Sequence, residues 1–205
     1  MLKKTFIELA GHFTTDVSLV EETWSEIETA YSNKRRHYHT LNHLENLLNQ
    51  LIENKNEISD WHAILFSLYF HDIIYTVLKT NNEEKSARVA EIKMTALTVP
   101  KEIIERCKGH INATKVHATS ADPDTNIFTD ADLSILGAPW QTYVQYCKCV
   151  RKEYLLYPDF MYNPGRKKVL IHFLQMPKIF KIGYFFENFE VQARKNLQQE
   201  FDTLL

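Results

Sequence analysis

The chain has few of the residues that break or bend secondary structure: 5 glycines and 6 prolines among 205 residues. Turn-rich all-β folds need many such residues, so their scarcity disfavours that class and suits long helices with few breaks. No segment alternates polar and apolar residues for long enough to require a sheet. The sequence therefore predicts an all-α fold of about eight or nine helices.

Cysteine is also scarce, with three residues at Cys107, Cys147 and Cys149. An odd number without framework spacing predicts free, packed thiols in a reducing compartment. No apolar run approaches the ~18 residues of a membrane-spanning helix, and Glu8 interrupts the N-terminal stretch where a signal peptide would be apolar. We expect a cytoplasmic protein with no membrane partner.

The charge balance is close to neutral, with a net charge of −2. There is thus no general basic field to hold nucleic acid or an anionic membrane, although local basic clusters could bind a small anion. The length predicts a single domain over residues 1–205. We expect its core over about residues 36–157, with C-terminal helices in 160–205 packed on it.

Helical periodicity is found in most of the chain. Amphipathic helices are predicted over residues 15–31, 38–54, 83–97, 102–117, 126–136, 139–157 and 188–204. Residues 56–78 are apolar on most sides, which predicts a buried central helix. Residues 165–174 form a short mixed segment, and 177–186 are compatible with helix or loop.

A histidine and an aspartate, His71 and Asp72, stand side by side inside that apolar run. Burying two ionisable groups costs several kcal/mol unless they are paired or bound to a metal. His43 and Asp132 are the partners that we expect to join them in a metal site. Two imidazoles and two carboxylates without thiolate suit Mn, Fe, Co, Ni, Zn or Mg, and leave positions for a water that becomes nucleophilic near neutral pH.

Each of these residues also has an ordinary structural interpretation. A lone helical histidine is more often a hydrogen-bonded core or surface residue, and Asp130 or Asp132 could simply stabilise a helix N-terminus. His39 and His43 have the spacing of a zinc protease motif, but Thr40 stands where the catalytic glutamate is needed, which excludes that class. The order of the set along the chain is what favours a shared metal.

The order His43, His71-Asp72, Asp132 resembles the HD-domain metal-dependent phosphohydrolases, an all-helical superfamily. Residues 38–43 (YHTLNH) and 131–134 (ADLS) also resemble runs of the cyclic-nucleotide phosphodiesterases of that superfamily. The chain is too short for their full catalytic domain, so a cyclic-nucleotide substrate is not expected. The closest resemblance is to small bacterial proteins described as predicted HD phosphohydrolases. It covers nearly the whole chain and rests on residues 36–39, 70–72, 82–87, 130–137 and 193–197.

This resemblance implies roles for individual residues. His43, His71, Asp72 and Asp132 would be metal ligands, and His39 would protonate the leaving oxygen. His39 is one helical turn from His43, so its imidazole can also face a reacting phosphoryl group on geometric grounds. Asp130 lies on nearly the opposite side of a helix from Asp132, which favours Asp132 as the ligand.

Further candidates supply acid–base chemistry or positive charge. Glu84, and after it Glu83, could act as general base or hold a metal-bound water, although acidic residues in the first turn of a helix need no such role. Binding of a phosphoryl group requires hydrogen-bond donors or cations. The candidates are Arg36, which is the best placed in the sequence, and Lys115, His117 and Arg151. Arg151 could instead stack on an aromatic ring or pair with Glu153.

The sequence thus predicts a metal-dependent hydrolase of a phosphate ester, acting on a nucleotide or another small phosphorylated metabolite and binding no nucleic acid. Two alternatives stay open: a di-iron oxygenase, for which His110 or His117 would have to serve as extra ligands, and a non-catalytic regulatory module that binds metal or nucleotide. The oligomeric state is undecided, and a homodimer is compatible with the sequence.

Overall fold

The protein is all-helical in the computed structural model, which describes residues 1–204. Leu205, the last residue of the predicted domain, lies outside the described residues. Over residues 1–204 there are ten α-helices, two short 3-10 helices and no strand, which confirms the predicted class. No helix in this range is both long and apolar enough to cross a membrane.

The helices divide between two compact units, residues 1–129 and 130–205, and the division falls inside helix α7. The first unit holds α1 (Leu2–Gly11), α2 (Val17–Tyr31), α3 (Leu41–Glu53), η1 (Lys55–Glu57), α4 (Trp61–Phe70), α5 (Asn82–Ala96), α6 (Lys101–Ala113) and the start of α7 (Pro123–Leu133). The second holds the end of α7, η2 (Ser134–Gly137), α8 (Trp140–Glu153), α9 (Asp159–Gln175) and α10 (Gly183–Thr203). Whether they act as one domain stays a prediction.

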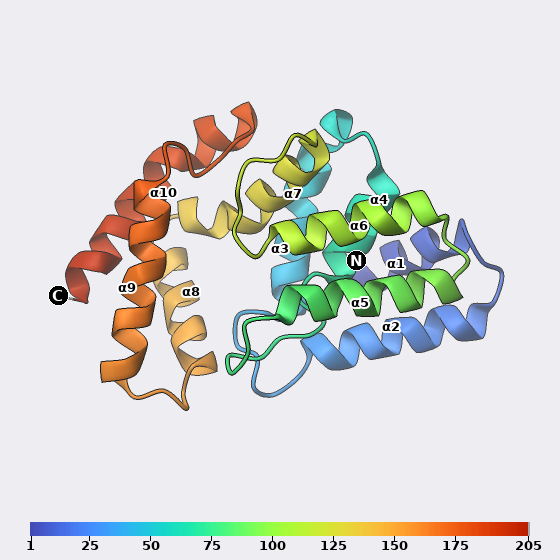
Figure 1. Ribbon diagram of the computed structural model, residues 1–205, viewed down its shortest axis with the longest axis horizontal. Helices are drawn as coiled ribbons and strands as arrows, with labels where there is room; N and C mark the ends of the chain where they lie inside the picture. Colours follow the sequence, from blue (N-terminus) through green and yellow to red (C-terminus); the bar gives the residue numbers. More distant parts are fainter. Residues whose placement is uncertain (205) are drawn as a thin grey trace. The chain divides into compact units, whose positions relative to one another are not determined.

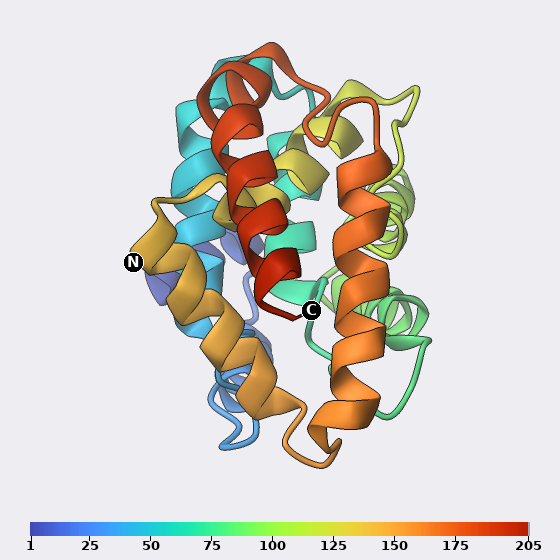
Figure 2. The ribbon, with the colours of Figure 1, turned by 90° about the vertical axis from the view of Figure 1, so that its left-hand side faces the viewer.

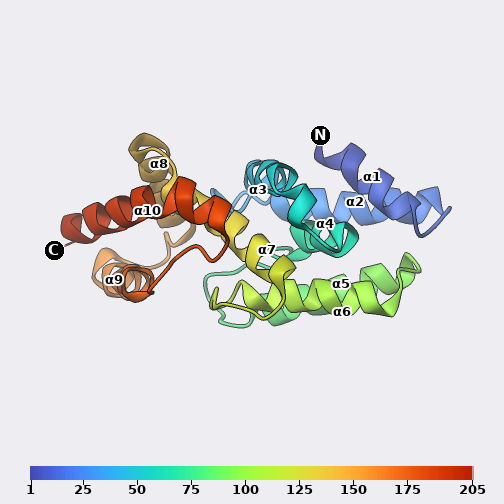
Figure 3. The same ribbon diagram turned by 90° about the horizontal axis from the view of Figure 1, so that it is seen from above.

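Helix α4 is the centre of the first unit and packs against α1, α3, α5 and α6, with α5 and α6 side by side (Figures 1 and 3). Its residues 63–70 are all buried, as expected of a helix that is apolar on every side. Tyr69 meets Phe6 of α1 edge-on at 5.1 Å between ring centroids and Trp24 of α2 at 6.3 Å. This aromatic contact joins three helices around one core.

The predicted helix over residues 56–78 is wrong in its bounds, because α4 begins only at Trp61 and ends at Phe70. At its start, the Asp60 carboxylate accepts the N–H of Ala63 at 3.0 Å and caps the helix. The Asp124 carboxylate accepts the N–H groups of Ser59 and Asp60, each at 2.8 Å, which holds the preceding residues out of helical conformation.

At its C-terminal end, α4 stops although the sequence continues with apolar residues. The Tyr31 hydroxyl accepts the N–H of Asp72 at 3.2 Å, and the Ser86 hydroxyl accepts that of Ile74 at 3.1 Å. The Arg36 guanidinium donates to the carbonyl oxygens of Asp72 and Ile73 at 2.7 and 2.9 Å. These distant partners replace helical hydrogen bonds, so His71 and Asp72 lie at the end of the helix rather than inside it.

Three other differences from the predicted helices concern the ends of the chain. Helix α1 had not been predicted, and α9 runs over Asp159–Gln175 where only a short segment was expected. Pro164 and Gly165 are an ordinary loop signal, but α9 continues through both and loses at Pro164 the one hydrogen bond that an N–H there would donate. Residues 177–182 are a loop, and α10 begins at Gly183.

A buried ion pair joins α9 and α10 of the second unit. Figure 2 shows the ribbons of these two helices. Arg166 of α9 donates to both carboxylate oxygens of Glu200 of α10, at 2.7 and 2.8 Å. The Tyr143 hydroxyl of α8 donates to the same carboxylate. The two-pronged geometry satisfies both charges, which is the condition under which a buried pair is tolerated.

Gly137 is required where η2 packs on α10. A Cβ atom at this position would lie 2.6 Å from the Cβ and carbonyl oxygen of Phe189 and 2.8 Å from its Cα. We therefore expect Gly137→Ala to lower the free energy of unfolding by about 1–3 kcal/mol, because backbone rather than a flexible side chain must move. Urea denaturation measures the change.

Gly165→Ala is the matched control, because no atom lies within 4 Å of a Cβ at that position. Being inside α9, it should be neutral or stabilise the protein by up to about 1 kcal/mol. Equal midpoints for Gly137→Ala and wild type would contradict the close approach of η2 to α10.

Candidate metal centre

His71 has a fixed ring orientation at the end of α4. Its Nδ1 is 3.0 Å from the carbonyl oxygen of Leu68 in the preceding turn, and the side chain is buried. A carbonyl can only accept, so Nδ1 carries the proton and the neutral ring presents the lone pair of Nε2 to the interior. Phe128 of α7 packs edge-on against the ring at 5.8 Å. Metal-binding histidines commonly use this tautomer, with the other ring N–H donated to a carbonyl or carboxylate.

His43, in the first turn of α3, presents a second ring nitrogen to the same point. Its Nε2 lies 3.1 Å from Nε2 of His71, and its side chain is buried. With the proton of His71 on Nδ1, a neutral pair must place the His43 proton on Nε2. When both Nε2 atoms are unprotonated, two lone pairs face one small space, which is an arrangement suited to a shared cation.

Asp72 places one carboxylate oxygen beside the imidazoles. Its Oδ2 is 3.2 Å from Nε2 of His71 and 3.9 Å from Nε2 of both His43 and His39. Burial alone would raise the pKa of the Asp72 carboxyl, but its attraction to the protonated forms of His71, His39 and His43 outweighs burial and holds that pKa well below its usual range. Asp72 is therefore an anionic oxygen donor at neutral pH.

Asp132 lies near the C-terminal end of helix α7. Phe128, which packs on His71, and Asp132 are four residues apart in one continuous helix and so share a face. Single ligand atoms of His43, His71 and Asp132 all lie within 4.8 Å of one another, so these three residues form a group that could hold a metal ion.

Asp130 faces elsewhere and has its own partners in the second unit. Its carboxylate accepts the N–H groups of Lys181 and Ile182 at 2.7 and 2.8 Å, and the Lys181 ammonium is 3.0 Å away. Burial raises its pKa, with Lys181 acting in the opposite direction. The preference for Asp132 over Asp130 as a ligand thus has a structural reason.

His39 lies at the edge of the group, just before α3 begins. Its Nε2 points toward Asp72 Oδ2, and its ring stacks on Tyr75 with centroids 4.0 Å apart. His39 is half-buried, unlike His43 and His71. It therefore combines contact with the ligand cluster and partial access to solvent.

Arg36 was expected to bind a phosphoryl group, and its observed contacts are with the chain itself. Besides the carbonyl oxygens of Asp72 and Ile73, it donates to that of His39 at 3.4 Å. Its guanidinium also lies over the rings of Tyr31 and Tyr75, at 4.9 and 5.7 Å from their centroids. These contacts give Arg36 a positioning role, and substrate binding by Arg36 stays a prediction.

One acidic candidate of α5 forms an ion pair with one basic candidate that follows α6. Lys115 and Glu84 form an exposed ion pair at 2.5 Å, which lowers the pKa of Glu84 and raises that of Lys115. Glu83 lies in the same first turn of α5. His117 ends the turn after α6 with a φ of 51°, in the left-handed region. None of the four belongs to the His43–His71–Asp132 group, and their predicted roles stay untested.

Arg151 binds the connection between α8 and α9 in the second unit. Its guanidinium donates to the carbonyl oxygens of Tyr154 and Tyr157, both at 3.0 Å, and pairs with Asp159 at 2.6 Å. It also lies 4.7 Å from the centroid of the Tyr162 ring. The expected aromatic contact is thus present, but the carboxylate partner is Asp159 rather than Glu153.

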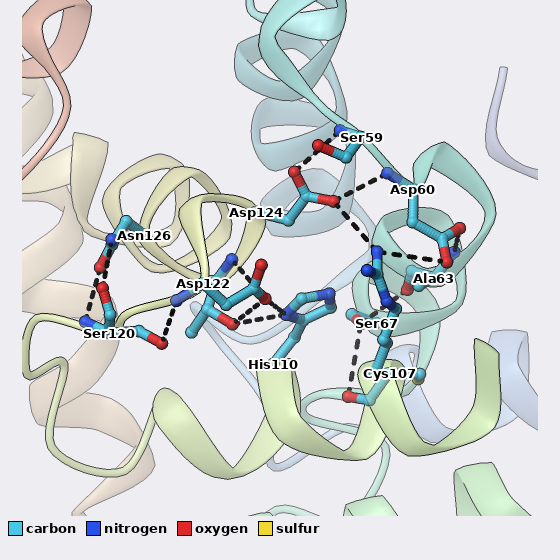
Figure 4. A network of polar contacts seen from close by, with 12 residues as sticks. Ser59, Asp60, Ala63, Ser67, Cys107, His110, Ser120, Asp122, Asp124 and Asn126 are labelled. Atoms are coloured by element: carbon cyan, nitrogen blue, oxygen red, sulfur yellow. Dashed lines mark hydrogen bonds and ion pairs between the residues drawn. The ribbon is translucent and has the colours of Figure 1, made fainter. Parts of the chain in front are cut away.

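His110, named as an extra ligand for a di-iron site, belongs to a different network (Figure 4). Its Nδ1 is 2.9 Å from the Thr125 hydroxyl, which in turn donates to Asp122 at 2.7 Å. Its Nε2 is buried with no hydrogen-bond partner among the described residues. His110 contacts Phe128 but stands outside the His43–His71–Asp132 group.

Comparisons with protein-family models, with curated proteins and with solved structures found no match to this chain. The geometry of the side chains is therefore the basis for any functional argument.

Several supporting residues could not have been found from the sequence. Tyr31 is part of the apolar stripe of α2, and nothing in that pattern shows that its hydroxyl binds the backbone at Asp72. Leu68 contributes only a backbone carbonyl, and Phe128 only a ring face. Such contacts carry no motif, because they depend on where distant elements meet.

Removing the guanidinium of Arg36 should destabilise the protein. Arg36→Met leaves carbonyl oxygens at the end of α4 without their donor, so we expect the free energy of unfolding to fall by about 2 kcal/mol or more. Arg36→Lys should recover only part of this loss, because an ammonium cannot fork to two carbonyls. Urea denaturation of both variants measures the difference.

Arg35→Met is the matched control, because Arg35 is an exposed neighbour of the same charge. It should change the free energy of unfolding by no more than about 0.5 kcal/mol. Equal losses in the two methionine variants would show that the Arg36 hydrogen bonds are unimportant.

His110 should make stability depend on pH. Burial lowers the pKa of the His110 imidazole. The carboxylates of Asp122, Asp124 and Asp60 act in the opposite direction, but the effect of burial is larger. Below the ordinary histidine pKa of ~6.5, the unfolded chain then binds a proton that the folded chain does not. Its contribution is thus present above that pH and is lost as pH falls, by up to about 1.4 kcal/mol per pH unit.

His110→Asn tests this, because the Asn amide can still donate to the Thr125 hydroxyl but does not titrate. Urea denaturation between pH 5 and 7.5 gives the free energy of unfolding at each pH. This free energy should rise less steeply with pH in the variant than in wild type. Parallel curves would assign the acid sensitivity to other groups.

Proposed function

We propose that the chain is a metal-dependent hydrolase of phosphate esters and that His43, His71, Asp72 and Asp132 hold its divalent ion. The observation that carries this proposal is the facing pair of Nε2 atoms of His43 and His71, 3.1 Å apart, with Nδ1 of His71 committed to a carbonyl. A simple hydrogen bond between two core histidines does not require carboxylates beside it, whereas here Asp72 and Asp132 both adjoin the pair.

The donor set fits a divalent ion of intermediate hardness. Two nitrogens and two carboxylate oxygens, with no thiolate, suit Mn, Fe, Co, Ni, Zn or Mg. Such an ion would supply Lewis acidity and an activated water near neutral pH. The donors come from α3, from α7 and from the two residues that follow α4, so they belong to helices and a helix end rather than to one loop.

The chain's own residues would orient the substrate and move the proton. His39 is beside Asp72 and half-exposed, so its imidazole can reach the leaving oxygen of a phosphate ester and protonate it. The stacked ring of Tyr75 restrains the imidazole of His39. We expect the substrate to be a nucleotide or another small phosphorylated molecule, with Lys115 and His117 as candidate contacts for its phosphate.

Metal analysis combined with phosphate release tests this proposal. The purified protein should bind a divalent ion and release phosphate from members of a panel of nucleotides and sugar phosphates with added Mn, Mg, Co or Ni. His71→Ala should weaken metal binding about 100-fold or more and abolish turnover. Removal of a residue that only hydrogen-bonds to a metal ligand already lowers metal affinity ~10–100-fold, and removal of a ligand should cost more.

His172→Ala is the control, because His172 is an exposed histidine of α9. It should leave metal binding and turnover unchanged. Undiminished phosphate release by metal-free His71→Ala protein would refute the metal-dependent mechanism. Two irons per chain with oxygen consumption would instead favour an oxygenase.

A further inference from the structure

The connection between α8 and α9 exposes a cluster of large apolar side chains. Leu155 and Leu156 follow the end of α8 and are 78% and 73% exposed, and Phe160 and Met161 in the first turn of α9 are 77% and 53% exposed. Single exposed apolar residues are normal, but here four lie within seven positions of the chain, around one turn. We refer to these four residues as the α8–α9 corner; Figure 2 shows the turn of the chain between the two helices.

The backbone of the α8–α9 corner is held in place rather than left loose. Arg151 binds the carbonyl oxygens of Tyr154 and Tyr157, on either side of the two leucines, and the carboxylate of Asp159 next to Phe160. The clamp fixes the turn from which the leucines project. Fixing the backbone in advance lowers the entropy cost of binding, so the corner is built to present its side chains to a partner.

The helices that flank the α8–α9 corner carry an excess of positive charge. Residues 148–168 contain six cationic and two anionic side chains, in a chain whose net charge is −2. Among these, Arg151 is paired with Asp159, Arg166 is paired with Glu200 of α10, and Glu153 is buried, which leaves four lysines. Lys148, Lys152 and Lys168 are exposed. Exposed apolar side chains on a turn whose flanking helices carry exposed lysines are the combination that anionic lipid surfaces recognise.

We propose that the α8–α9 corner docks on an anionic lipid surface, with its leucines and aromatic ring entering the headgroup layer and the lysines contacting lipid phosphates and carboxylates. A protein partner fits less well, because a stable protein interface uses ~20–30 residues on each side. Tyr154 and Tyr157, half-buried beside the corner, have the amphipathic character of residues at a membrane interface. The whole-chain charge gave no sign of this surface, because the cations are local.

Vesicle sedimentation tests the proposal with the full chain and without any assay of activity. Wild-type protein should sediment with vesicles of phosphatidylcholine plus phosphatidylserine, but not with phosphatidylcholine alone, and less so at 1 M salt, where charges are screened beyond ~3 Å. The double variant Leu156→Ser/Phe160→Ser should bind about 10-fold more weakly or worse. Lys148→Glu/Lys152→Glu should weaken binding to a similar extent.

Val17→Ser/Val191→Ser is the matched control, because these valines are 72% and 66% exposed but lie on α2 and α10. It should bind as wild type does, and thermal unfolding should confirm that all variants are folded. Three results would overturn the proposal: no binding of wild type to anionic vesicles, equal binding by the corner variants, or a lipid-free dimer that Leu156→Ser/Phe160→Ser converts to monomer.

Discussion

The termination of α4 at Phe70 is the constraint on which the candidate centre depends. The sequence beyond it is apolar enough to continue the helix, but the backbone groups of residues 72–74 bind Tyr31, Arg36 and Ser86 instead. A continued helix would direct His71 and Asp72 to different sides, about 100° apart. Because the chain leaves the helix there, Oδ2 of Asp72 and Nε2 of His71 approach to 3.2 Å.

The two histidines also have contacts that restrain their side chains. His71 is held from one side by the carbonyl of Leu68 and from the other by the ring of Phe128. His43 enters from the first turn of α3, whose inner face is wholly buried. Polar groups that are costly to bury are thus placed where the core allows them little movement, which favours one coordination geometry over many.

The second unit also buries ionisable side chains, but there they pair with one another. Glu200, Arg166 and Tyr143 are buried polar groups that satisfy one another across three helices. Arg151, in contrast, donates hydrogen bonds to backbone carbonyl oxygens of an exposed turn. One arginine therefore stabilises the interior of the unit, and the other shapes its surface.

The sequence by itself determined the helical class, most of the helices and the residue types of the candidate centre. These follow from local properties: scarce Gly and Pro, periodic apolar residues, and ionisable groups in an apolar run. Only the tertiary structure decided where α4 stops, that α9 runs through Pro164, and that Arg36 and Arg151 bind backbone carbonyls. The reason is that hydrogen bonds to distant partners override local propensity, and no short stretch of sequence encodes which partners will meet.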